Sequence, residues 1–478
     1  MPEDDYINIP TSLQQIITAE QAWHYSIVPR AERNGTLEFF IDEHKEQEGI
    51  AEELELLFGK KIVLVSESSG LVNKSLGKYY RKSNKQRKSE NLLVNGNYSD
   101  DFLIKLISEA NSIGSSDIHI ESYEEKCRIR MRLDGKLMER YVLNRDDYPA
   151  LINKIKIKSN LDIAEKRLPQ DGRIFFHSGS DKFDIRVSVL PTLYGEKVVM
   201  RLLSKDATDI DIAALGLTER QMQDYREAIR KPHGIILISG PTGSGKTTTL
   251  YATLKILNQE TSNILTIEDP IEYTLEGINQ VQLKESIGLT FASALRTFLR
   301  QDPDIIMLGE IRDNETAQMA VRAALTGHLV LSTIHTNSAW GTISRLIDME
   351  VPPYLVAGTL ILSVAQRLVR LLCPACKQKT DFDKKLFPGN FSPYRELQYH
   401  YMPKGCPECY FTGYKGRRAI FEMIPVGEEL SEKIKNLQLD ASKVLKNKDI
   451  KLLSETAFEM FERGETSIEE IYSILLNA

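Results

Sequence analysis

The segment from Gly240 to Thr248 constrains the fold of this chain more than any other stretch. It reads Gly-Pro-Thr-Gly-Ser-Gly-Lys-Thr-Thr and contains the pattern G-x-x-x-x-G-K-[ST]. An apolar run at 235–238 precedes it, and apolar residues at helical spacing follow it. Strand, glycine turn and helix in this order predict a loop whose backbone N–H groups meet one phosphate group. A glycine-rich turn between core elements is the alternative, and these flanks disfavour it.

Each part of this loop has a predicted task in binding ATP. The glycines can adopt positive φ and let the main chain approach phosphate oxygens. The Lys246 ammonium would meet the β- and γ-phosphates, and the Thr247 hydroxyl would ligate Mg²⁺. The predicted binding residues of the loop are Gly240, Pro241, Thr242, Gly243, Ser244, Gly245, Lys246, Thr247 and Thr248.

Two later apolar runs end in carboxylates. Residues 263–267 lead into Glu268, and residues 305–308 lead into Gly309 and Glu310. The carboxyl ends of strands face the ligand crevice of an open α/β sheet. Glu268 is therefore predicted to accept a proton from, or to orient, a water that attacks the γ-phosphate. Glu310 is predicted to act at Mg²⁺, where Asp is more usual, although a strand-end acid can also be structural.

Two histidines bracket a further predicted strand. His328 precedes residues 329–334 and His335 follows them. A histidine in such a place can polarise a phosphate group or can be an ordinary surface or core residue, and the sequence leaves both interpretations open.

Four of the five cysteines have the spacing of a metal site. Cys373 and Cys376 form one C-x-x-C pair, Cys406 and Cys409 form a second, and twenty-nine residues separate the pairs. Four thiolates suit tetrahedral Zn²⁺. Two copies of the motif favour zinc over a redox role, and the metal is expected to hold a small insert together. Cys127 is predicted to be a core residue.

Length and composition indicate several soluble domains. A chain of 478 residues suggests about three domains, and a pI near 5.9 argues against a general nucleic-acid binder. The acidic start without an apolar run predicts a protein that stays in the cytoplasm. The longest apolar stretch, 354–365, is interrupted by Gln366 and Arg367 and is predicted to be a buried helix rather than a membrane span.

The front of the chain is predicted to hold a small α/β domain and a linker. Helical patterns at 12–25 and 46–58 alternate with strand patterns at 36–41 and 61–65, so residues 1–66 are assigned to this domain. Residues 67–100 are rich in basic and small polar residues and are predicted to be a flexible basic linker. Contact of this run with anionic lipid or another subunit is the alternative.

A second domain is predicted over residues 101–205. A helix at 102–112 and a strand at 117–121 precede a hairpin that turns at Asp134 and Gly135. Alternate arginines on the first hairpin strand are expected to be solvated; these are Arg128, Arg130 and Arg132.

Several segments of the chain together carry a family resemblance. They are Gly240–Thr247, Thr266–Tyr273, Leu299–Asp304, Gly309–Asp313, Thr326–His328, Thr333–Thr336 and, in the preceding domain, Ser116–Glu121 and Pro169–Arg173. In this order they resemble the ATPases that drive type II secretion and assemble type IV pili, and the resemblance runs from about Asp101 to the C-terminus.

The resemblance implies a fold class, an assembly and further site residues. It implies an α/β chain with a RecA-like ATPase domain at 206–478, a preceding PAS-like α+β domain and a zinc insert at 373–422. Glu268 would be the catalytic glutamate, Glu310 would act at Mg²⁺, and His328 and His335 would line the site. The arginines that match family residues at nucleotide phosphates or at a neighbouring site are Arg186, Arg201, Arg296 and Arg300.

The resemblance also implies partners. The chain would form a homo-hexamer in the cytoplasm, held at the inner membrane by platform and docking proteins that contact the N-terminal domain, without a specific nucleic acid. The four-cysteine module is typical of the secretion and pilus-extension members rather than the retraction members. The front of the chain lacks the family's cyclic-dinucleotide motif, so cyclic di-GMP binding is not predicted. A zinc-containing nucleic-acid motor and a nucleotide-dependent scaffold without turnover are the alternatives.

Overall fold

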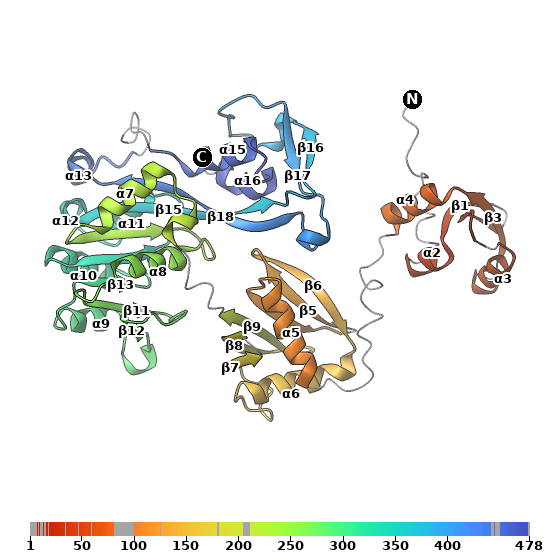
Figure 1. Ribbon diagram of the computed structural model, residues 1–478, viewed down its shortest axis with the longest axis horizontal. Coiled ribbons are helices and arrows are strands. Elements are labelled where there is room, and N and C mark those ends of the chain that lie inside the picture. Colours follow the sequence, from red (N-terminus) through yellow and green to blue (C-terminus); the bar gives the residue numbers. More distant parts are fainter. Residues whose placement is uncertain are drawn as a thin grey trace. The chain divides into compact units, whose positions relative to one another are not determined.

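The fold of the chain was analysed in a computed structural model. It describes residues 7, 9, 13, 16–17, 19–33, 35–45, 47–58, 60–80, 100–124, 126–178, 181–203, 211–440, 444 and 450–476. The chain divides into two compact units, residues 1–98 and 99–478 (Figure 1). None of the described helices is both long and apolar enough to cross a membrane.

The first unit is a small α/β domain. Its described residues form the sheet β1-β2-β3, in which β1 and β2 are antiparallel and β2 and β3 are parallel. The apolar strand patterns predicted two of these strands. The helix expected at 12–25 is present from Ala19 to Tyr25, and most of its earlier part lies outside the described residues. The elements are α2 (Ala19–Tyr25), β1 (Ile27–Arg33), β2 (Thr36–Asp42), α3 (Gln47–Phe58), β3 (Lys61–Glu67) and α4 (Ser69–Tyr79).

The linker prediction was wrong over its first third, because α4 occupies that stretch. Val72, Leu76 and Tyr80 lie at four-residue spacing, and all three are buried in the core of this unit. Only a few apolar residues mark this helix among lysines and glycines, so its period was missed in the sequence. The strongly basic run at 81–99 lies outside the described residues.

The second unit begins with an antiparallel sheet of order β6-β5-β4-β9-β8-β7, as far as its described residues show. Asp134 and Gly135 both have positive φ, 46° and 85°, which confirms the predicted tight hairpin between β5 and β6. The elements are α5 (Asp100–Ser112), β4 (Asp117–Ser122), β5 (Cys127–Leu133), β6 (Lys136–Leu143), α6 (Tyr148–Lys158), β7 (Gln170–Ser178), β8 (Asp181–Thr192) and β9 (Gly195–Leu203). Cys127 is buried, as predicted.

The arginines of β5 are not simply solvated, which corrects the expectation for this face. Arg128 and Arg130 bind Glu121 on β4, and Arg132 lies 3.3 Å from Asp117 on the same strand. Every residue of β4 is buried, because these long side chains cover its polar side.

The region predicted to be the ATPase domain, residues 206–478, is called the motor domain below. Its sheet has the order β12-β11-β13-β14-β10-β15-β18, counted over its described residues. All neighbours are parallel except β15 and β18. The strands are β10 (Gly234–Ser239), β11 (Ile264–Glu268), β12 (Asn279–Gln282), β13 (Ile305–Leu308), β14 (Leu329–Ile334), β15 (Leu360–Leu372) and β18 (Tyr414–Pro425). The helices are α7 (Glu219–Ile229), α8 (Lys246–Leu257), α9 (Phe291–Phe298), α10 (Asn314–Leu325), α11 (Gly341–Asp348), α12 (Pro353–Thr359), α13 (Glu428–Lys435), α15 (Leu453–Glu462) and α16 (Ile468–Leu476).

Both faces of this sheet are covered at its centre, which is why the central strands β10, β13 and β14 are nearly continuous apolar runs. Ile235 and Leu237 of β10 belong to one apolar core, which also includes residues of α10. Ile236 and Ile238 belong to the other, with residues of α8. The α/β fold class predicted from the strand and helix patterns is therefore confirmed.

The apolar stretch at 354–365 is a helix only in its first half. Helix α12 ends at Thr359, and from Leu360 the chain continues as β15, hydrogen-bonded between β10 and β18. A central strand buried on both faces has the same unbroken apolar pattern as a buried helix, so periodicity could not separate the two.

The cysteine-containing segment between β15 and β18 packs against helix α15 through aromatic side chains. It contains a small hairpin of β16 (Gln378–Asp381) and β17 (Tyr399–Met402). Phe387 stacks near Phe458 and Phe461 of α15, with ring centroids 5.9 Å apart in both pairs. Aromatic contacts therefore hold this segment in addition to the metal that the sequence predicts. Residues 414–422, predicted to lie in the insert, belong to β18 of the main sheet.

Candidate nucleotide and metal sites

The glycine-rich loop joins β10 to α8 with an open helix N-terminus. Gly243 and Gly245 have φ of 80° and 88°, a conformation that side chains disfavour. No side chain caps the N-terminus of α8, which begins directly after Gly245. The Ser244 hydroxyl oxygen is buried and has no hydrogen-bond partner among the residues that the structure describes. Uncapped N–H groups and an unsatisfied hydroxyl fit the oxygens of a phosphate group.

Lys246 closes this loop on itself. Its ammonium nitrogen donates to the carbonyl oxygens of Gly240 at 2.8 Å and Pro241 at 3.1 Å. Burial lowers the pKa of Lys246, and the negative charge of Glu310 opposes that shift. The lysine and Glu310 therefore lie at the same end of the sheet, although they come from different strand–loop units.

Glu310 follows β13 and lies beside Arg312 and His335. Its carboxylate accepts a hydrogen bond from Arg312 and lies 3.3 Å from Nε2 of His335. Burial alone would raise the pKa of Glu310, but these two partners outweigh it and hold that pKa below its usual range. Arg312 also lies 3.8 Å from Asp269, so acidic and basic groups alternate along this edge.

Glu268 ends β11 but does not open toward the loop. Its side chain is 3% exposed and accepts hydrogen bonds from the Tyr251 hydroxyl, from Thr266 at 2.6 Å and from Gln280 at 3.1 Å. These three donors take most of the acceptor sites of the carboxylate. Because the side chain is also buried, an attacking water has little access to Glu268 in this conformation.

His328 lies at the opposite edge of the sheet from His335. Strands β10 and β14 are parallel and in register from Gly234 and Leu329 onward, so the start of β14 is remote from the loop that follows β10. The Nδ1 atom of His328 lies 2.8 Å from the carbonyl oxygen of Ala323. The structure thus brings His335, and not His328, to the loop of its own chain.

The four predicted arginines also lie away from the loop of their own chain. Arg296 on α9 pairs with Glu315. Arg300 lies just after that helix, and its guanidinium donates to the Arg296 carbonyl oxygen at 2.9 Å. Arg186 and Arg201 are cross-strand neighbours on β8 and β9.

Arg186 nevertheless reaches the motor domain. It lies 3.0 Å from Glu272 and donates to the Ile271 carbonyl oxygen. Its Nε atom is buried and has no partner among the described residues. Arg201 instead donates to Asp117 at 2.9 Å.

Two polar residues that contact the loop were missed in the sequence. Gln366 and Arg367 lie on β15, where the apolar pattern made them look like the end of a helix. The Arg367 guanidinium donates to the carbonyl oxygen of Asn337, beyond His335, at 2.9 Å. Their position in the sequence could have indicated this contact, because polar residues that interrupt a buried strand need hydrogen-bond partners close by.

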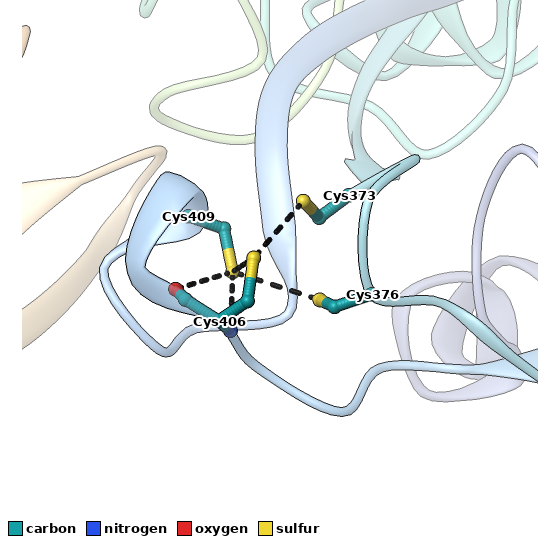
Figure 2. Close-up of side chains that lie close together, drawn as sticks. All are labelled: Cys373, Cys376, Cys406 and Cys409. Atoms are coloured by element: carbon teal, nitrogen blue, oxygen red, sulfur yellow. Dashed lines mark hydrogen bonds between the residues drawn. The ribbon is translucent and has the colours of Figure 1, made fainter.

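The four predicted cysteines converge on one point (Figure 2). Cys373 and Cys376 follow β15 and face Cys406 and Cys409 across a short gap. Sulfur atoms lie 3.8 Å apart in the pairs 373/406 and 376/409, and 3.7 Å apart in the pair 406/409. A tetrahedral ion with bonds of about 2.3 Å separates its sulfur ligands by about 3.8 Å. The arrangement fits zinc, and the separations are too long for disulfides.

Backbone N–H groups favour the thiolate form of one of these cysteines, which is the form that binds a metal. Burial would raise the pKa of Cys409, but N–H groups of Cys406 and Gly413 point at its sulfur and lower that pKa to about 7. A thiol with this pKa is easily held as the thiolate that a metal requires.

Comparison with known proteins identifies close relatives of this chain. Residues 97–473 match the model of the family described as type II/IV secretion system protein. The type II secretion system ATPase E of Vibrio cholerae is 47% identical over 383 residues, which cover 78% of this chain and 75% of that protein. The type IV pilus assembly ATPase PilB of Myxococcus xanthus is 42% identical over 456 residues, 88% of this chain and 79% of that protein.

Solved structures agree with the fold. The pilus retraction motor PilT with bound ADP superimposes with a TM-score of 0.53 at 26% identity, covering 78% of this chain and 96% of PilT. The ATPase DotB of Legionella pneumophila gives a TM-score of 0.61 at 23% identity, covering 80% of this chain and 97% of DotB, and supports the fold alone. The nucleic-acid motor is therefore not favoured. This chain belongs to the type II/IV secretion system protein family, together with secretion and pilus-assembly ATPases.

Proposed function

We propose that this chain hydrolyses ATP to drive the assembly of a pilus or pseudopilus in a type II secretion or type IV pilus machine. The observation that carries the proposal is the meeting of the Gly240–Thr248 loop with Glu310 and His335 at one edge of the sheet. The relatives named as secretion and pilus ATPases support the same conclusion.

Each residue at this edge of the sheet has a separate proposed role in phosphoryl transfer. Loop N–H groups bind the β- and γ-phosphates, and Lys246 exchanges its two carbonyl acceptors for phosphate oxygens. Thr247 and Glu310 would hold Mg²⁺, which supplies positive charge to the transferring group. Glu310, aided by His335, orients the attacking water, because its charge acts on the loop lysine and its carboxylate is less buried than that of Glu268. Glu268 serves as the proton acceptor only after its hydrogen bonds with Tyr251 and Gln280 rearrange.

The arginines that do not reach their own loop are proposed to act between chains. Charge that develops on the γ-phosphoryl group is often met by an arginine from a neighbouring unit. Arg186 and Arg201 would supply it in a closed homo-hexamer, and Arg296, Arg300 and His328 would lie nearer to a subunit boundary than to their own site.

The rest of the chain is proposed to connect this motor to its machine. Residues 1–66 with helix α4 would dock onto a platform or docking protein of the inner membrane, and the protein would stay in the cytoplasm as a peripheral component. The residues Cys373, Cys376, Cys406 and Cys409 would hold one structural Zn²⁺.

Replacement of the loop lysine tests the ATPase. Lys246→Ala removes a cation that stabilises transferring phosphate, so turnover is expected to fall by about 10²-fold or more while the melting temperature changes little. Phosphate release and thermal unfolding would be measured on the full chain. Lys255→Ala, an exposed lysine at the other end of α8, is the matched control and should keep wild-type turnover. Normal turnover by folded Lys246→Ala would contradict the site.

A further inference from the structure

Strand β15 runs past the end of β10 and continues beside the phosphate loop. Its pairing with β10 stops at Ala365, and the next residue, Gln366, lies against the loop. A Cβ atom on Gly240 would lie 2.5 Å from the Gln366 carbonyl oxygen, and one on Gly245 would lie 2.9 Å from Nε2 of Gln366. The loop is thus packed directly on this strand, with no room for a side chain at either glycine.

The Gln366 side chain bridges the loop and the helix that follows it. Its Nε2 atom donates to the carbonyl oxygen of Ser244 at 2.9 Å, and its Oε1 atom accepts from the Thr249 hydroxyl at 2.8 Å. Only 1% of Gln366 is exposed, so water does not replace these partners. A carbonyl oxygen only accepts, hence the group that faces Ser244 must be the amide NH₂.

We infer that Gln366 is a positioning residue for the phosphate-binding loop, a role that rests on the proposed ATPase function. The peptide plane between Ser244 and Gly245 is rigid, so a donor that fixes the Ser244 carbonyl also fixes the direction of the Gly245 N–H. A phosphate group is bound well only when several loop N–H groups point at it together. Glycine itself cannot hold this direction, because it allows many backbone conformations.

Gln366→Met tests this role without adding charge. Methionine is similar to glutamine in length and is uncharged, but it is apolar and leaves the buried Ser244 carbonyl without its hydrogen-bond donor. The affinity for Mg-ATP is expected to fall about tenfold to hundredfold, the usual effect of one unsatisfied buried hydrogen-bonding group. Affinity would be measured by titration with a fluorescent ATP analogue, and melting temperature would be measured in parallel.

Gln221→Met is the matched control. Gln221 on α7 is 8% exposed, donates to the Phe421 carbonyl oxygen at 2.9 Å and accepts from the Thr218 N–H at 3.1 Å, but it does not touch the loop. Both variants should lose similar thermal stability, and only Gln366→Met should lose affinity for the nucleotide. Equal ATP affinity of the two variants would overturn the inference.

A second substitution covers the case in which Gln366→Met does not fold. Thr249→Val keeps the shape of its buried side chain but removes the donor to Oε1 of Gln366, so the amide loses one of its two anchors. ATP binding about three- to tenfold weaker is expected, since one neutral hydrogen bond is lost. Wild-type affinity in Thr249→Val would overturn the role of Gln366. A wild-type protein that binds no nucleotide would instead contradict the proposed ATPase.

Discussion

Glu121 shows how a single buried charge organises the polar face of the second domain. Its carboxylate is 5% exposed and accepts hydrogen bonds from two nitrogens of Arg130, both at 2.8 Å, and from Arg128 at 3.0 Å. Lys197 lies 3.0 Å away. Burial would raise the pKa of Glu121, but these cations outweigh it and lower the pKa from 4.5 to about 2.

This shift predicts a loss of stability in acid. Because the folded-state pKa of Glu121 is lowered, its stabilisation is present above pH 4.5 and is lost as the pH falls toward 2. At about 1.4 kcal/mol per pH unit, the contribution is at most about 3 kcal/mol. Urea unfolding between pH 7 and pH 2.5 should show Glu121→Gln less stable than wild type at pH 7 and nearly equal to it at the acid end.

Glu139→Gln is the control for this prediction. The Glu139 carboxylate is 41% exposed and lies 3.7 Å from Arg128, and exposed pairs of this kind contribute less than about 1 kcal/mol. A constant gap between Glu121→Gln and wild type across this pH range would contradict the linkage.

Position along a strand could be predicted for the carboxylates: Glu268 ends β11 and Glu310 follows the neighbouring parallel strand β13. The sequence did not separate the two histidines, although His328 precedes β14 and His335 follows it. The sequence could not show that the Glu268 carboxylate is hydrogen-bonded by three donors. The rotamer of this strand-end side chain depends on Tyr251 and Gln280, which are remote in the sequence.

At the level of elements, the strands β10, β11, β13 and β14 were predictable because each is a short apolar run that ends in a turn. Other elements were not, and α4 and β15 show why. Helix α4 shows few apolar residues among its lysines, and β15 has the unbroken apolar pattern of a helix. The aromatic packing of the cysteine segment onto α15 was also hidden, because Phe387 and Phe458 are far apart in the sequence.

The cysteine segment gives a prediction at this scale. The purified protein should carry one Zn²⁺ per chain, and Cys406→Ser should lose it, because three thiolates and a hydroxyl hold zinc poorly. Loss of structure in Cys406→Ser should be confined to the region of β16 and β17, since the aromatic contacts with α15 remain. Metal content by mass spectrometry and local hydrogen exchange would be measured. Cys127→Ser, at a buried cysteine of the second domain, should keep the metal, and full zinc in Cys406→Ser would mean that the ligand set is wrong.

At the scale of the whole molecule, the question is which cations one chain supplies to its own nucleotide site. In the described part of the second unit, the cations at the loop edge include Lys246 and Arg312, and Arg312 is engaged by Glu310. Arg186 is held by Glu272 and Ile271, with its Nε atom unsatisfied. The sequence indicated arginines in a separate domain but could not show this contact, which depends on the placement of two domains.

Ring assembly predicts a dependence on concentration. Turnover per chain should rise as rings form, and Arg186→Ala should lower turnover by about 10³-fold or more while ATP binding is retained, because an arginine acts on the developing charge. In mixed rings, Arg186→Ala chains should depress wild-type partners beyond simple dilution. Arg167→Ala, an exposed residue of the same domain, is the control. A dilute monomer with full specific activity would refute the ring requirement.

The continuity of β15 restricts how this protein can change in length over evolution. One strand carries Gln366 at the phosphate loop and ends at Leu372, directly before Cys373, and its register against β18 is regular from Leu362 to Arg370. Side chains alternate between the faces of a regular strand, so inserting or deleting one residue between Gln366 and Arg370 would turn one end to the wrong face. A single-residue indel there would disrupt either the loop contact or the cysteine cluster, whereas the segment between Cys376 and Cys406 can vary in length at much lower cost.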